Sequence, residues 1–142
     1  MREYGEARQN YQQALAIRIA FGDRYSQAST YHQLGIVAQA LREYGEARQN
    51  YQQALAIKIE FGDRYEQAST YGQLGLLAEV ENNFTEAGQN LLQALEIFTQ
   101  FQDQHIVEMT VNNLSRIYQT TQDQSLLEAM AKVLGVTVEE II

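Results

Sequence analysis

The chain has 142 residues, with ten basic and eighteen acidic side chains and a net charge of −8 at pH 7. This acidic excess disfavours binding to a nucleic-acid backbone or to an anionic membrane surface, because both are negatively charged. The absence of cysteine excludes disulfides and thiolate metal sites, and the absence of proline leaves helices uninterrupted. No apolar run is long enough to cross a membrane, and the polar start does not resemble a signal peptide. We therefore expect a cytoplasmic protein.

The sequence repeats itself with a period of 40 residues. Residues 2–17 recur unchanged at 42–57, and 31 of 40 positions are identical between residues 2–41 and 42–81. A weaker copy begins at Asn82, and a fourth begins near Gln122 and soon loses the pattern. Self-similarity at a fixed period of roughly 20–50 residues is typical of solenoids.

Each copy is predicted to form two helices. In the copy that begins at Arg42, one helical face is marked by apolar residues at spacings of three or four, which are Tyr44, Ala47, Tyr51, Ala54, Leu55 and Ile59. Gly62 suits the left-handed residue that ends a helix. Asp63 and Glu66 form a capping-box-like start to the next helix. The apolar side of that helix carries Ala68, Tyr71, Leu74, Gly75 and Ala78.

In chain order, we expect helices at about residues 3–20, 24–41, 44–60, 64–81, 84–100, 104–120 and 124–134. Short connections make neighbouring helices antiparallel. Residues 2–21 then form the second helix of an incomplete repeat, residues 22–61 and 62–101 two full hairpins, and residues 102–135 a divergent last hairpin. Gly135 ends the seventh helix, and Thr137 with Glu140 forms a capping box, so residues 136–142 begin a C-terminal cap helix. We expect residues 1–142 to form a single domain.

Small residues mark a close contact between the two helices of each hairpin. Gly35 and Gly75 lie on the first helix, and Ala47 and Ala87 lie on the second. Without bulky side chains, the two helices can approach closely at this level, and Tyr and Leu fill the space on either side.

These residues resemble the tetratricopeptide repeat family, whose pattern is an aromatic residue, Leu-Gly, Ala, a second aromatic residue and Ala. The pattern occurs as Tyr31, Leu34, Gly35, Ala47, Tyr51 and Ala54, and again as Tyr71, Leu74, Gly75, Ala87, Leu91 and Ala94. The 40-residue period is similar to the long-helix variant found in kinesin light chains and in many bacterial multi-repeat proteins. The resemblance implies an all-α, right-handed solenoid of antiparallel hairpins that acts as a protein-interaction scaffold, often within a larger signalling or effector protein.

The resemblance also implies a binding surface, because in this family the first helix of each hairpin lines a concave groove. The matching positions, which we call the predicted groove residues, are Ser29, His32, Gln33, Ile36, Gln39, Ser69, Gly72, Gln73, Leu76, Glu79, Met109, Asn112, Asn113 and Arg116. Ile36, Leu76 and Met109 among amides suit an extended or helical segment of mixed polarity. The Lys and Arg of the family's two-carboxylate clamp are missing from the earlier units, so capture of a peptide's C-terminal carboxylate is not expected.

No combination of residues predicts chemistry. His32 can hydrogen-bond a partner or sense pH, although a structural role is the simpler interpretation. His105 lies beside Asp103 in the first turn of a helix and fits a capping role. Neither histidine has a second ligand four residues on, and nucleophile-elbow and phosphate-loop patterns are absent. We therefore expect no enzyme activity, no metal and no cofactor.

Two other functions remain open. The first is self-assembly, because the helix at residues 3–20 has no hairpin partner and exposes Tyr4, Tyr11 and Leu15 unless another copy covers them. This gives a homo-oligomer formed through the N-terminal helix. The second is a ligand-sensing regulatory repeat domain, which the lack of a convergent polar cluster disfavours.

Overall fold

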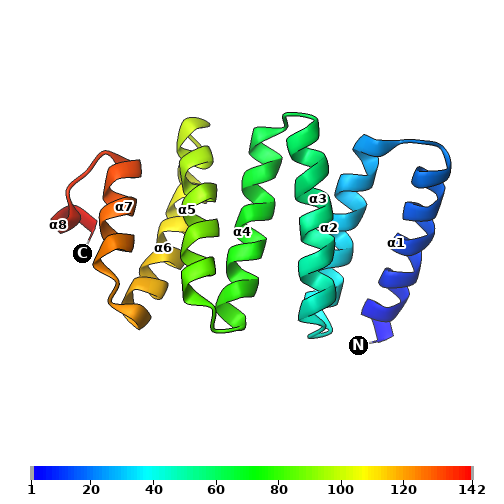
Figure 1. Ribbon diagram of the computed structural model, residues 1–142, viewed down its shortest axis with the longest axis horizontal. Coiled ribbons are helices and arrows are strands. Elements are labelled where there is room, and N and C mark those ends of the chain that lie inside the picture. The colour runs from blue at the N-terminus through cyan, green and yellow to red at the C-terminus, as the bar shows by residue number, and fades with distance from the viewer. Residues whose placement is uncertain (1, 142) are drawn as a thin grey trace. The chain divides into compact units, whose positions relative to one another are not determined.

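The computed structural model describes residues 2–141 and contains only helices over that range (Figure 1). They are α1 (Arg2–Ala20), α2 (Arg24–Ala40), α3 (Tyr44–Glu60), α4 (Arg64–Val80), α5 (Phe84–Gln100), α6 (Gln104–Thr121), α7 (Gln124–Leu134) and α8 (Val138–Ile141). The seven predicted helices are confirmed to within about one residue at each end. The short α8 begins where the second capping box predicted a further helix.

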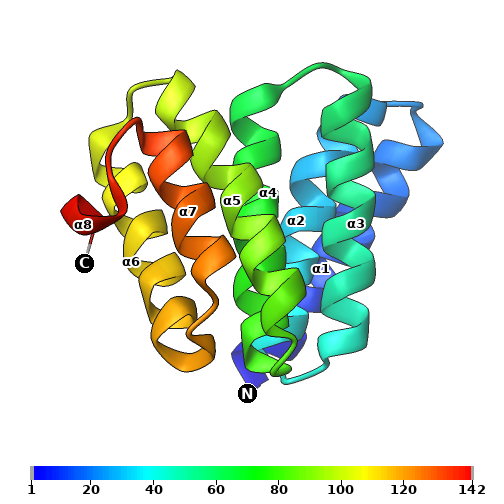
Figure 2. The same cartoon turned by 60° about the vertical axis from the view of Figure 1, so that its left-hand side comes forward.

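The chain divides into two compact units, Met1–Thr70 and Tyr71–Ile142, with the boundary inside α4. In the first unit, α2 packs against α1 and more extensively against α3. In the second unit, α5 packs against α6, and α7 lies against both (Figure 2). The all-α fold of consecutive antiparallel helices is confirmed. The handedness of the solenoid and the single domain remain predictions.

The turns explain why the helices keep a regular length. A left-handed residue occurs every 20 residues, with φ between 56° and 68°, at Gly22, Arg42, Gly62, Asn82, Gln102 and Gln122. In the turn after α3, the N–H of Asp63 donates back to the carbonyl of Lys58 at 3.0 Å, and the turns at Glu43 and Asn83 repeat this bond. Such Schellman bonds satisfy the last carbonyls of a helix. The repeated bond therefore holds the turn even where glycine is replaced.

The residue after each left-handed residue stands directly before the first residue of the next helix. Asp23, Asn83, Asp103 and Asp123 accept a backbone N–H two or three residues on, as an N-cap does. Glu43 occupies the same place without a side-chain cap bond. With Asp63, aspartate and asparagine caps thus mark five of the helix starts.

The two predicted capping boxes have different outcomes. Asp63 accepts the N–H of Glu66 at 3.4 Å, so the cap itself is confirmed. The reciprocal half is wrong, because the N–H of Asp63 already donates to Lys58, and the Glu66 carboxylate faces the Lys58 ammonium at 3.6 Å. The second box is complete: Thr137 N–H donates to Glu140 at 3.2 Å, and Glu140 N–H donates to Thr137 Oγ1 at 3.3 Å.

Close helix contacts occur at the two predicted glycines. A Cβ atom on Gly35 would lie 2.6 Å from the Tyr51 ring, and one on Gly75 would lie 2.7 Å from Leu91 Cγ and 3.2 Å from the Ala87 carbonyl. Tyr51 rather than Ala47 therefore fills the space opposite Gly35. Because real Cβ atoms do not approach so closely, any larger residue forces these helices apart.

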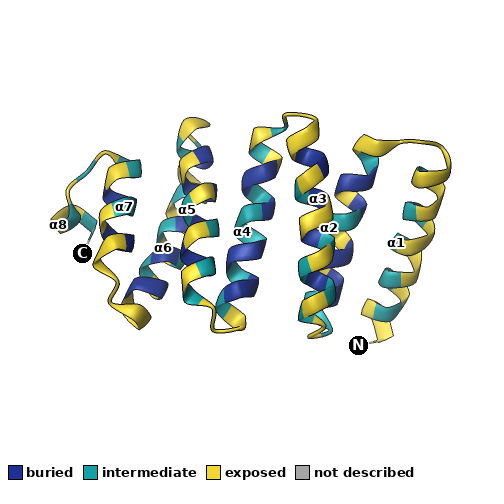
Figure 3. Cartoon of the chain, in the orientation of Figure 1, coloured by how far each residue is buried: buried dark blue, intermediate teal, exposed yellow. Residues whose placement is uncertain are grey.

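The second unit has a continuous core, shown in dark blue in Figure 3. Its largest fully buried members are Leu91, Leu95, Leu114, Ile117, Leu127 and Met130. Val133 of α7 and Val138 and Ile141 of α8 pack against this cluster. The last two helices therefore cover the preceding hairpin with apolar side chains.

Candidate functional site

The predicted groove residues all lie outside the buried cores. In the first unit, Ser29, Gln33 and Ile36 are exposed, and His32, Gln39 and Ser69 are half-buried. In the second unit, Met109, Asn112 and Arg116 are exposed, and Gly72, Gln73, Leu76, Glu79 and Asn113 are half-buried. Spacings of three or four place Met109, Asn112 and Arg116 on one accessible face of α6. Their use as a common groove remains a prediction.

His32 belongs to a contact network inside the first unit. Its Nδ1 lies 3.2 Å from Thr70 Oγ1 and 3.5 Å from Lys58 Nζ, and its ring meets the Tyr51 ring edge-on at 5.5 Å. Burial, together with the Lys58 cation, lowers the pKa of His32 to about 4. The ring is therefore neutral at pH 7, which supports the structural role and argues against pH sensing near neutrality.

The centre of this network is Lys58, which is almost completely buried. Its ammonium donates to Thr70 Oγ1 at 2.7 Å and faces the Glu66 carboxylate at 3.6 Å. Burial lowers the pKa of Lys58, and the nearby Glu66 opposes this shift. These contacts leave no unsatisfied buried side-chain atom among the described residues.

The same contact occurs one repeat earlier. Arg18 donates to Thr30 Oγ1 and to the Ser26 carbonyl. In the third copy Phe98 takes the place of the basic residue, and Thr110, like Thr30 and Thr70, donates to the carbonyl four residues before it in its own helix. The sequence analysis did not predict this contact between a basic residue and a threonine. A signal was visible, because in both near-identical copies a threonine follows the basic residue twelve positions later.

Arg116 forms an ion pair within the second unit. Its Nε and Nη2 donate to the two carboxylate oxygens of Glu79, each at 2.7 Å, and this contact raises the pKa of Arg116. Such bidentate geometry fixes the guanidinium in one orientation. The basic groove position predicted from the sequence is therefore already engaged by another predicted groove residue.

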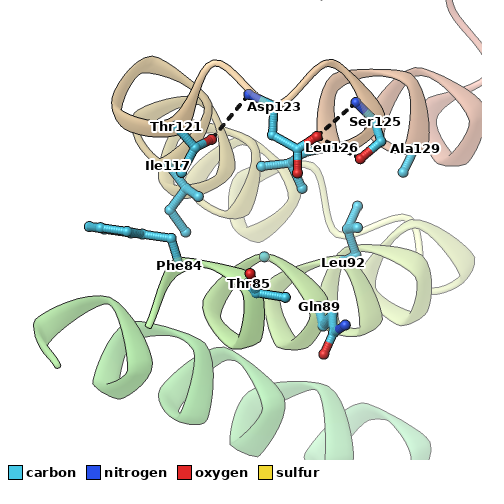
Figure 4. Close-up of a pocket in the computed structure, with 11 residues that line it drawn as sticks. Phe84, Thr85, Gln89, Leu92, Ile117, Thr121, Asp123, Ser125, Leu126 and Ala129 are labelled. Carbon is cyan, nitrogen blue, oxygen red and sulfur yellow. Dashed lines mark hydrogen bonds between the residues drawn. The ribbon is translucent and has the colours of Figure 1, made fainter. Parts of the chain in front are cut away.

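The second unit also contains a groove that sequence reasoning did not find. A cavity of about 390 Å³ lies between α5, the end of α6 and the start of α7 (Figure 4). A second cavity, of about 690 Å³, continues along α5 and α7. The two share Gln89, Leu92 and Ala129, so we describe them together as the α5–α7 groove. No predicted groove residue lines either cavity.

Two kinds of feature are absent from the described residues. Between residues 2 and 141, no three His, Asp or Glu side chains gather in a way that could hold a metal ion. Over the same range, no helix is long and apolar enough to cross a membrane.

Residues 1–60 match the family described as "Tetratricopeptide repeat". Tetratricopeptide repeats are therefore identified in residues 1–60. The fold of the chain is similar to the crystal structure of BtubC (BKLC) from P. vanneervenii, with a TM-score of 0.81 and 22% sequence identity. The similarity covers 98% of this chain and 56% of that chain, so the present chain spans little more than half of the BtubC chain. A comparison with curated proteins gave no match. Tetratricopeptide repeats are in general protein-interaction modules and are typically not catalytic.

Proposed function

We propose that this tetratricopeptide repeat chain is a scaffold that binds a peptide or helical segment of a partner protein through the predicted groove residues. The main support is the row on α6, where Met109 is 49% exposed and lies beside Asn112 and Asn113. An accessible thioether among amides offers one apolar contact together with hydrogen bonds to a peptide backbone. We further propose that the module serves a larger signalling or effector protein.

The test uses a fluorescent peptide selected from a random library against the whole chain. Met109→Ala should weaken its binding by about tenfold, the loss expected when one apolar side chain leaves an interface. Val80→Ala is the matched control, because Val80 is 51% exposed in the same unit and is not a predicted groove residue. An equal loss in both variants, or no loss in either, contradicts groove binding.

A second candidate function is self-assembly through α1. One observation favours it: α1 contains no buried residue between Arg2 and Ala20, although it carries Tyr4, Ile17 and Ile19. Large exposed apolar patches mark interaction sites. Sedimentation over a hundredfold concentration range tests this function, and a monomer at every concentration rules it out.

A further inference from the structure

α5 differs from α1 and α3 at three equivalent positions that are spaced four residues apart along one side of the helix. α1 and α3 both carry Arg, Gln and Ala there, at residues 8, 12 and 16 and at residues 48, 52 and 56. α5 carries Gly88, Leu92 and Glu96. A spacing of four residues places all three on one face of the helix. In α5, therefore, a basic residue is lost, and an apolar and an acidic residue are gained.

These three positions border the α5–α7 groove. A Cβ atom on Gly88 would lie 3.3 Å from Leu126 of α7, so glycine lets α7 approach. Leu92 points from α5 toward α7 in Figure 4 and, with Ala129 and Val133, forms the apolar wall of the groove. Contact with α7 thus explains Gly88. It does not explain the exposed carboxylate of Glu96, which lies where α1 and α3 have alanine.

The second unit, which contains the groove, is acidic. The second unit holds ten acidic and two basic residues, whereas the first holds eight of each, so the whole net charge of −8 lies in residues 71–142. Of the two basic residues, Arg116 is paired with Glu79, and Lys132 lines the groove. The Asp123 carboxylate at the other end accepts from Ser125 N–H and Oγ, whereas Glu96 has no comparable helix-capping role.

We propose that the α5–α7 groove binds a basic amphipathic helix of a partner protein. An apolar side chain of that helix packs against Leu92 beside Leu126, and a basic side chain pairs with Glu96. An amphipathic helix laid into an apolar groove is a recurrent mode of recognition. The lined part of α5, residues 84–100, is about 24 Å long at 1.5 Å per residue, enough for a helix of about 16 residues. This surface uses α5 and α7, whereas the predicted groove residues of the second unit lie on α4 and α6.

The test measures binding of two synthetic 16-residue peptides by fluorescence anisotropy at physiological salt. One has leucine on a single helical face and lysine elsewhere, and the other has glutamate in place of lysine. Only the lysine peptide should bind. Leu92→Gln restores the residue of α1 and α3 and should weaken binding by about tenfold. Glu96→Ala also restores their residue and should weaken it by about threefold, as expected for an exposed ion pair.

The control for overall charge is Glu108→Ala, which removes one exposed acid from α6 outside the groove and should leave binding unchanged. Amide NMR shifts on adding the lysine peptide should fall on residues 84–100 and 125–133. Absence of binding, binding of the glutamate peptide, an equal loss in Glu108→Ala, or shifts confined to α4 and α6 would each overturn the proposal. If Leu92→Gln does not fold, Glu96→Ala and the NMR shifts still decide it.

Discussion

Residues 2–17 are identical to residues 42–57, so α1 and α3 share the helical sequence of residues 4–17 and 44–57, yet the two helices differ in burial. The shared part of α3 buries Ala47, Tyr51, Ala54 and Ile57, whereas α1 buries nothing between Arg2 and Ala20 (Figure 3). Ile57 has no exposed surface, and its counterpart Ile17 is 58% exposed. Local sequence therefore determines that a helix forms and which face is apolar. A neighbouring helix determines whether that face becomes core.

α2 is one of the helices that cover the apolar face of α3. Gly35 admits the Tyr51 ring, and Tyr51 donates its hydroxyl to Gln39 at 2.9 Å. Tyr11, at the same position in α1, is only half-buried. Since the hydrophobic contribution scales with the apolar area removed from water, identical side chains in the two helices should contribute different free energies of folding.

The largest expected effect tests this difference directly. Tyr51→Ala should lower the free energy of unfolding by about 3–5 kcal/mol, as for other large-to-small changes in a core. Tyr11→Ala, in the same sequence context, should lower it by about 1 kcal/mol. Urea denaturation of both variants measures the pair. Similar losses would mean that the neighbouring helix does not set the burial of this position.

The second prediction tests the equivalent close helix contact in the second unit, at Gly75. Gly75→Leu should destabilise by about 1–3 kcal/mol or more, because Leu91 and the Ala87 carbonyl leave no room for a side chain. Gly72→Leu is the control, since Gly72 lies in the same helix as Gly75 and a Cβ atom there would meet nothing within 4 Å. Chemical denaturation should place Gly72→Leu near or above the wild type, because leucine favours a helix more than glycine does. A Gly75→Leu curve that matches the wild type would disprove the close contact.

The helices could be predicted from the sequence because their ends are local signals. Asp63 and Asn83 mark helix starts within a few residues, and Gly62 and Gly135 mark helix ends. Arg42 and Gln102 occupy the same place in the turns after α2 and α5 as Gly62 does after α3, and they adopt the same left-handed conformation, although neither residue type favours it. The 40-residue period made the missing signals recoverable by alignment.

The contacts that shape the candidate surfaces were harder to predict. His32 meets Thr70 at a separation of 38 residues, and Arg116 meets Glu79 at 37. Each pair joins helices in adjacent repeats, and only one copy carries the histidine or the arginine, so the repeat gave no second example. Leu92 was visible as a departure from Gln12 and Gln52, but its role depends on where α7 lies.

The third prediction concerns pH. The folded pKa of His32 is about 4, below its ordinary value of 6.5, so below pH 6.5 the unfolded chain binds a proton that the folded chain does not. Stability should therefore fall between about pH 6.5 and 4, by roughly 1–2 kcal/mol once solvent screening of this half-buried ring is allowed for. His32→Gln should flatten the curve in this window. Urea midpoints at half-unit pH steps measure it, and a variant as pH-dependent as the wild type would be inconsistent with the network.

The last prediction asks whether the bare face of α1 is used. If two copies bury this face, a charge placed on it must weaken their association. Ile17→Lys should raise the dissociation constant of the oligomer by at least about tenfold, because an apolar contact is lost and a charge is desolvated. Ile59→Lys provides the control, since Ile59 is 52% exposed on α3 and lies outside the α1 face. Light scattering at matched concentrations compares the two, and an Ile17→Lys protein that associates as well as Ile59→Lys would show that α1 is not the contact.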